Sequence, residues 1–146
     1  MKALTTVAIA LLVGAAPVHA DGDWIRPVTH AATQEECGAC HMAYPAGFLP
    51  ARSWSAIMGD LENHFGENAQ LDEATRAEIE AYLVSNASKG FRLSVFSTPP
   101  IKISELRWFK HEHSHEVSSA MMRKAKSFSN CAACHRGAEQ GYFDDD

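Results

Sequence analysis

Four cysteines form two copies of one five-residue pattern, and this pattern constrains the fold more than any other feature. The copies are Cys37-Gly-Ala-Cys40-His41 and Cys131-Ala-Ala-Cys134-His135, so no cysteine is left over. Two thiols at this spacing, followed directly by an imidazole, match the attachment signature of c-type haem. The thiols can reach the two vinyl groups on one porphyrin edge, and the histidine can coordinate the iron. The sequence therefore predicts two covalently bound haem c groups.

Zinc binding and disulfide formation are weaker explanations of the paired cysteines. Two C-x-x-C pairs can hold a structural zinc, but the histidine after each pair would then be a coincidence. Disulfides suit an exported protein, yet neither pair lies in the β-α-β pattern of a redox-active C-x-x-C motif. Haem also supplies a core to a chain too short to bury much apolar surface. We therefore expect the haem-free chain to be largely unfolded.

The first twenty residues, 1–20, are typical of a secretory signal peptide. Lys2 begins it, the run from Ala3 to Ala16 is almost entirely apolar, and Val18-His19-Ala20 resembles a cleavage site. The alternative is a membrane anchor, but a span needs about 20 apolar residues and this run is shorter. We predict cleavage after Ala20 and a periplasmic location.

The charge of the chain favours protein partners over nucleic acid. Removing residues 1–20 leaves 126 residues, with 12 basic against 18 acidic side chains and a net charge of −6. An acidic protein is a poor nucleic-acid binder. We expect redox protein partners with a basic surface, and contact with a membrane only through such a partner.

Hydrophobic spacing predicts an all-α protein with extensive loops, organised around its haems. One helix is expected from an N-cap at Ser53 to Phe65, ended by Gly66, and another from Asp72 to about Ala87, closing near Gly90. The apolar faces consist of Trp54, Ile57, Met58, Leu61 and Phe65 in the first helix and Ile79, Tyr82, Leu83 and Ala87 in the second.

A linker, Ser97-Thr98-Pro99-Pro100, divides the chain into two haem-binding parts. Before it, residues 21–95 form the first haem-binding domain, in which residues 21–36 are expected to be polar and irregular. After it, residues 96–146 form a second haem-binding segment packed on the first. This segment contains a short predicted helix from Ser104 to His115 and a basic, weakly apolar stretch from Met121 to Phe128.

The ligand opposite each motif histidine matters because axial ligands are a principal control on haem potential. His64 flanks the apolar face of the helix predicted from Ser53, so we favour it for the first iron over a solvated helix-end histidine. Met58, on the same face, is better explained as a core residue. For the second iron, spacing alone does not choose among His111, His113 and His115. Further candidates are Met42, Met121, Met122 and His30.

Several short blocks that span nearly all of residues 21–146 are specific in combination. They are Glu36–Tyr44, Ser53-Trp54 with Met58, His64–Ala69, Ile79–Leu83, Trp108-Phe109 with His113, and Asn130–His135 with Ala138 and Gly141. In these blocks the chain resembles the bacterial dihaem cytochrome c family, whose members are small exported proteins with bis-histidine haems. The resemblance implies His64 and His113 as the distal ligands. It also implies a membrane b-type cytochrome as electron donor and a small oxygen-binding monohaem cytochrome c as acceptor.

We interpret the chain as a periplasmic two-haem electron carrier and not as an enzyme. With both irons six-coordinate and low-spin, no position would be open for oxygen or peroxide, and the redox chemistry would belong to the haem. A dihaem peroxidase would need an open distal site and normally a longer chain. A gas or redox sensor would bind carbon monoxide when reduced, and a carrier with His/Met ligands would have a higher potential.

Overall fold

Short helices joined by long loops make up the computed structural model, which describes residues 24–89 and 98–144. In these ranges the helices are α1 (Ala31–Gly38), α2 (Ala51–Met58), α3 (Glu73–Ser85), α4 (Arg107–His113) and α5 (Ser119–Ala125). The same residues contain no β-strand, only isolated bridges between Trp24 and Tyr142 and between His64 and Glu67. The all-α prediction is confirmed. None of the helices described is long and apolar enough to cross a membrane.

The helix predicted from Asp72 to about Ala87 is observed as α3. Asp72 caps its first turn by accepting hydrogen bonds from the backbone N–H of Thr75 at 3.1 Å and from its hydroxyl at 2.6 Å. Ile79 and Leu83 are buried against α2, as expected from the apolar face. The predicted end near Gly90 lies outside the described residues.

The helix predicted from Ser53 to Phe65 is shorter than expected and begins earlier. α2 starts after Pro50, so Ser53 is a buried residue inside the helix and not its N-cap. The helix stops at Met58, and a separate 3₁₀ turn follows at Leu61–Asn63. The apolar pattern continued across Gly59, whose conformational freedom disfavours a helix interior. The prediction followed the apolar spacing and passed over this glycine.

An unpredicted helix, α1, begins within the residues expected to be irregular and ends inside the first motif, at Gly38. His30 caps it, accepting a hydrogen bond at Nδ1 from the backbone N–H of Thr33 at 3.4 Å. The other ring nitrogen of His30 lies 2.9 Å from the Glu78 carboxylate, and its ring stacks on Tyr82 at 4.9 Å. Histidine is not a usual N-cap and α1 has little apolar face, so the sequence carried no clear helix signal. Both ring nitrogens of this candidate ligand already have protein partners.

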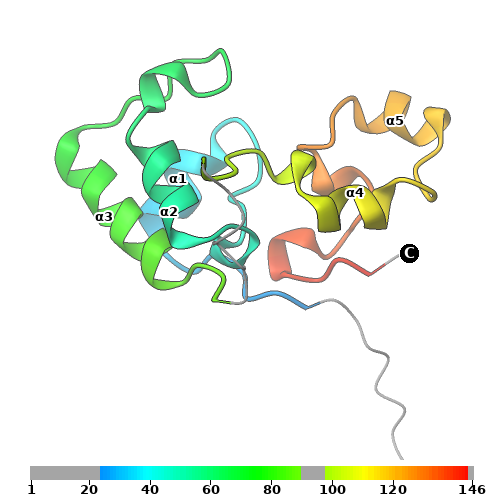
Figure 1. Cartoon of the computed structure of the whole chain (residues 1–146), viewed down its shortest axis with the longest axis horizontal. Coiled ribbons are helices and arrows are strands. Elements are labelled where there is room, and N and C mark those ends of the chain that lie inside the picture. Colours follow the sequence, from blue (N-terminus) through cyan, green and yellow to red (C-terminus); the bar gives the residue numbers. More distant parts are fainter. Residues whose placement is uncertain (1–23, 90–97, 145–146) are drawn as a thin grey trace, which may run out of the picture.

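The two halves of the chain share one core, although their helices lie apart in Figure 1, with α1, α2 and α3 on one side and α4 and α5 on the other. Leu106 and Phe109, from the second half, belong to the same buried cluster as Leu49, Trp54, Ile79 and Leu83. Their segment forms a 3₁₀ turn at Ile103–Glu105 and then α4, which is shorter than the helix predicted from Ser104 to His115. The basic stretch predicted from Met121 to Phe128 overlaps α5, which begins at Ser119 and is capped by Ser118.

Ile25 and Gly141, near the two ends of the described chain, are in contact. We predict that Gly141 does not tolerate a larger residue. Gly141 has φ +86°, its carbonyl accepts a hydrogen bond from the Ile25 N–H at 2.8 Å, and a Cβ there would overlap the Ile25 carbonyl oxygen. Gly141→Ala should cost at least about 1–3 kcal/mol from backbone strain alone. That loss lowers Tm by roughly 5 °C or more in a domain of this size, measurable by thermal circular dichroism of the haem-loaded protein.

Gly38→Ala is the matched control for Gly141→Ala. A Cβ at Gly38 meets no atom within 4 Å, and the change makes the first motif read Cys-Ala-Ala-Cys-His, as the second already does. Its Tm should stay close to that of the unmodified protein. Equal Tm values for the two variants would contradict the close packing at Gly141.

Candidate haem-binding sites

The first motif histidine lies opposite a second histidine at a separation suited to one iron. The ring centres of His41 and His64 are 6.3 Å apart and their planes differ by 23°. A metal–imidazole bond is about 2 Å long and the ring centre lies roughly 1 Å beyond the nitrogen, so two rings on opposite sides of a metal are about 6 Å apart. The pair therefore fits an iron held between them.

His64 reaches this position on a tight turn and not on a helix face, so the geometric reason for the prediction was wrong. The Glu67 N–H donates to the His64 carbonyl at 3.1 Å, with Phe65 at φ 53° and Gly66 at φ 104° between them. Burial, and then the nearby His41, lower the pKa of His64. A lower pKa favours the neutral imidazole, which is the form that coordinates a metal.

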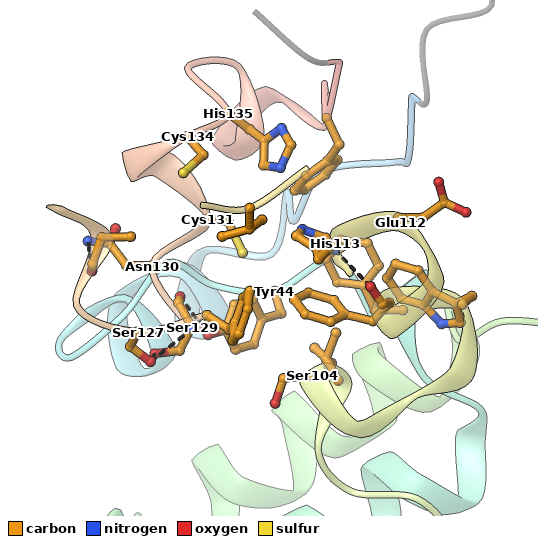
Figure 2. Close-up of a pocket in the computed structure, with 18 of the residues that line it drawn as sticks. Tyr44, Ser104, Glu112, His113, Ser127, Ser129, Asn130, Cys131, Cys134 and His135 are labelled. Atoms are coloured by element: carbon orange, nitrogen blue, oxygen red, sulfur yellow. Dashed lines mark hydrogen bonds between the residues drawn. The ribbon is translucent and has the colours of Figure 1, made fainter. Parts of the chain in front are cut away.

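The second motif histidine forms a similar pair with the last residue of α4. The ring centres of His113 and His135 are 6.1 Å apart, and their planes are nearly perpendicular at 83°. Both side chains line a cavity of about 880 Å³, with Cys131 and Cys134 in the same wall. Figure 2 shows the two rings pointing into this space from different segments of the chain. The volume lies in the range of pockets that hold molecules of cofactor size.

Backbone carbonyls orient three of these four imidazoles. Nδ1 of His41 lies 2.7 Å from the Met42 carbonyl oxygen, and Nδ1 of His113 lies 2.8 Å from that of Phe109. Nδ1 of His135 lies 3.2 Å from the Asp144 carbonyl oxygen. A carbonyl only accepts, so each Nδ1 must donate its hydrogen, which leaves Nε2 with the lone pair. Metal-bound histidines are usually held in this way.

The structure separates His113 from its two neighbours. The His111 side chain is 84% exposed and lies beside Glu112, and His115 lies beyond the end of α4 on the surface. Of the three, only His113 stacks on Phe109 and pairs with His135.

The methionine candidates differ in placement. Met58 is buried in the shared core, in agreement with its interpretation as a packing residue. Met42 contributes its backbone carbonyl to His41. Met121 and Met122 both line the cavity that contains His113, so they are the nearest alternatives to it.

The four cysteines lie beside the histidine pairs, and no disulfide joins them. Cys37 and Cys131 are partly buried, and Cys40 and Cys134 are exposed. Burial, with the Glu36 charge added at Cys37, raises the pKa of the Cys37 and Cys131 thiols. Within residues 24–89 and 98–144, no group of three or more metal-binding side chains forms a site of the kind that zinc requires.

Several aromatic residues of the second cavity were not predicted as site residues. Trp24, Phe48, Phe128 and Phe143 line it although they lie far apart in the sequence. Trp24 and Phe128 are still 55% and 41% exposed, which suits side chains that cover a large flat apolar group. The one available signal was that these aromatic residues lie outside the predicted helices.

Comparisons with known proteins agree on one family. Residues 33–143 match the family described as dihaem cytochrome c. A diheme cytochrome c from Rhodobacter sphaeroides is 57% identical with a TM-score of 0.76, over 81% of this chain and 99% of that chain. A second structure, of DHC purified from Rhodobacter sphaeroides, is 60% identical with a TM-score of 0.72, over 80% and 99% of the two chains.

A third solved structure is less similar to this chain. A diheme cytochrome type c from Shewanella baltica OS155 is 45% identical with a TM-score of 0.66, over 78% of this chain and 86% of that chain. No curated protein sequence matches the chain. The family match covers both C-x-x-C-H motifs and both histidine pairs. The chain is therefore a haem electron-transfer protein with two haem c groups and belongs to the dihaem cytochrome c family.

Proposed function

We propose that this protein is a periplasmic carrier with two bis-histidine haems, which accepts electrons from a membrane b-type cytochrome and passes them to a small oxygen-binding monohaem cytochrome c. The main support is the ring separation of 6.3 Å for His41 and His64 and of 6.1 Å for His113 and His135. With a histidine on each side, neither iron offers a position for oxygen or peroxide. Such a protein transfers electrons and does not transform a substrate.

The haem supplies reversible one-electron exchange between ferric and ferrous iron, and the chain controls its surroundings. His41 and His135 would hold the irons on the attachment side, and His64 and His113 would hold them on the other side. The carbonyls of Met42, Phe109 and Asp144 keep Nε2 of their histidines available.

Tyr44 provides a contact between the two sites. Its ring stacks on His41 at 4.6 Å, and the same side chain lines the cavity of the second site. Its hydroxyl donates to the Ser129 carbonyl at 2.8 Å, just before the second motif. Burial raises the pKa of Tyr44 to about 12, so the phenol stays neutral at physiological pH. One side chain in contact with both sites supports transfer of electrons between the haems within the protein.

Exposed carboxylates around the first site support a basic partner. Glu35 and Glu36 precede Cys37 in α1, and Glu62 and Glu67 flank His64 in its loop. Opposite charge on a partner would speed encounter, and this attraction weakens as salt screens it. The predicted signal peptide supports the periplasmic location.

Spectroscopy of the oxidised protein separates this proposal from its alternatives. We expect two low-spin ferric haems with the near-infrared magnetic circular dichroism of bis-histidine ligation, and no carbon monoxide binding on reduction. A sulfur-to-iron charge-transfer band would instead indicate a methionine ligand. A high-spin haem with peroxide turnover would indicate a peroxidase, and carbon monoxide binding would indicate a sensor.

The proposed partners need a kinetic test. Stopped-flow mixing of the reduced protein with an oxidised monohaem cytochrome c should give rapid transfer that slows as salt is added. Glu62→Gln and Glu67→Gln should weaken the salt dependence. Transfer that is slow and independent of salt would argue against this partner class.

His64→Met is expected to raise the potential of the first haem by roughly 0.1 V or more, within the ~0.8 V range that axial ligands span. A thioether stabilises ferric iron less than an imidazole does, so the oxidised state becomes less favourable. Spectroelectrochemical titration measures both potentials. His30→Asn, which keeps a good helix cap, is the control and should move neither potential. An unchanged potential and a bis-histidine spectrum in His64→Met would show that another residue is the ligand.

A further inference from the structure

The ring centres are about equally far apart in the two histidine pairs, but the angle between the ring planes differs. The planes of His41 and His64 are close to parallel, differing by 23°, whereas those of His113 and His135 are close to perpendicular, differing by 83°. This difference bears on bis-histidine ligation as proposed above, because an imidazole interacts with the iron d orbitals mainly perpendicular to its plane.

Phe109 holds the His113 ring at two points. Their rings stack at a centre distance of 3.9 Å with planes only 10° apart. The carbonyl of Phe109, one helical turn earlier, accepts the Nδ1–H of His113 at 2.8 Å. Phe109 is itself buried in the shared core, so it cannot turn easily with the histidine.

The other aromatic rings at the second site are not parallel to the histidine rings that they contact. Phe128 meets both rings edge-on, at 86° to His113 and 87° to Phe109. On the opposite side, the Asp144 carbonyl accepts from His135, and Phe143 lies at 61° to that ring. The face of Phe109 is therefore the contact that matches the plane of His113.

The first site uses a different arrangement. Tyr44 stacks on the motif histidine, His41, with planes 13° apart, and the distal His64 meets Phe65 at 61°. A stacked aromatic ring thus accompanies the attachment-side histidine at the first site and the distal histidine at the second.

We propose that Phe109 is a positioning residue that keeps His113 perpendicular to His135, and that this makes the two haems electronically different. Parallel imidazoles act on the same iron d orbital and raise it above its partner, which stabilises the ferric state. Perpendicular imidazoles act on one orbital each and leave the two nearly equal in energy. The orientation therefore contributes to a lower potential at the first haem than at the second, although both have the same ligands.

Electron paramagnetic resonance of the fully oxidised protein at liquid-helium temperature tests the orientation. We expect two low-spin signals of equal spin count: a rhombic one with three resolved g values from the first haem, and a highly axial one with a single large g value from the second. Two rhombic signals would overturn the inference while leaving bis-histidine ligation intact. A high-spin signal or a sulfur-to-iron band would instead contradict the proposed ligation.

Phe109→Leu tests the residue, because leucine keeps apolar volume but removes the flat ring. We expect both haems to stay low-spin, the highly axial signal to shift toward rhombic or broaden, and the rhombic signal to be unchanged. Phe109→Tyr, which keeps the ring, should retain the axial signal. Phe128→Leu removes an aromatic that meets His113 only by its edge and should also retain it.

Two results would refute the role of Phe109. One is an unchanged axial signal in Phe109→Leu with both haems attached. The other is an equal shift in Phe128→Leu, which would show that general packing and not stacking sets the angle. If Phe109→Leu does not fold, comparison of Phe109→Tyr and Phe128→Leu with the unmodified protein still decides the question, because a shift in Phe109→Tyr or in Phe128→Leu contradicts the proposal.

Discussion

Replacing His113 by alanine is expected to convert the second haem from low-spin to high-spin and to open it to carbon monoxide after reduction. The His113 ring lies 6.1 Å from that of His135, and with the ligation proposed above its removal would leave the iron with one axial histidine. Cys131, Cys134 and His135 are untouched, so the haem stays attached. Optical and electron paramagnetic resonance spectra should show one high-spin and one low-spin haem. The reduced protein should bind one carbon monoxide molecule.

The neighbouring histidines supply the controls. His111→Ala and His115→Ala should leave both haems low-spin, because these side chains are exposed and lie away from the His113 and His135 pair. In His113→Ala either neighbour can capture the vacated iron if the end of α4 unwinds, and a triple variant removes that route. A second haem that remains six-coordinate and low-spin in the triple variant would contradict His113 as ligand and direct attention to Met121 and Met122, which line the same cavity.

Removal of both thiols of the second motif is expected to unfold residues 98–144 while leaving much of the first half folded. In Cys131→Ala/Cys134→Ala the second haem is no longer anchored in its cavity of about 880 Å³. Without the haem, the apolar side chains that line this cavity lose the large flat group that would pack against them. The cavity then collapses or fills with water, at the expense of native packing around His113 and Phe128.

Hydrogen exchange followed by mass spectrometry shows which helices lose their folded structure in this double variant. Amides of α4 and α5 should exchange much faster, while those of α3 keep most of their protection, because Ile79 and Leu83 remain packed against α2. Ala132→Gly is the matched control, since it makes the second motif Cys-Gly-Ala-Cys-His like the first and keeps both thiols. Undiminished protection in α4 and α5 of the double variant would show that this half folds without its haem.

The elements predicted well from the sequence are those whose signals are local. α3 begins directly after its predicted cap, Asp72, and ends two residues before the predicted Ala87, since its cap and its apolar face lie within one segment. The prediction failed where local signals were weak or conflicting. α1 has almost no apolar face, and α2 ends before Gly59 although the apolar spacing continues beyond it. The cap of α1, His30, has its partners in α3, whereas α2 ends where Gly59 disfavours a helix interior.

The sequence by itself determined the number and chemistry of the cofactors, because each C-x-x-C-H motif is a covalent unit whose five residues are consecutive. The spacing could not show which of His111, His113 and His115 is the ligand. Residues two positions apart on a helix point to different sides, and the spacing does not show which side faces the haem. The tertiary structure makes that distinction by placing one of these rings against Phe109 and across from His135. It also brings His64 to His41 by a turn, and sets one pair of rings parallel and the other perpendicular. Such angles depend on contacts between segments far apart in the chain, which no local pattern encodes.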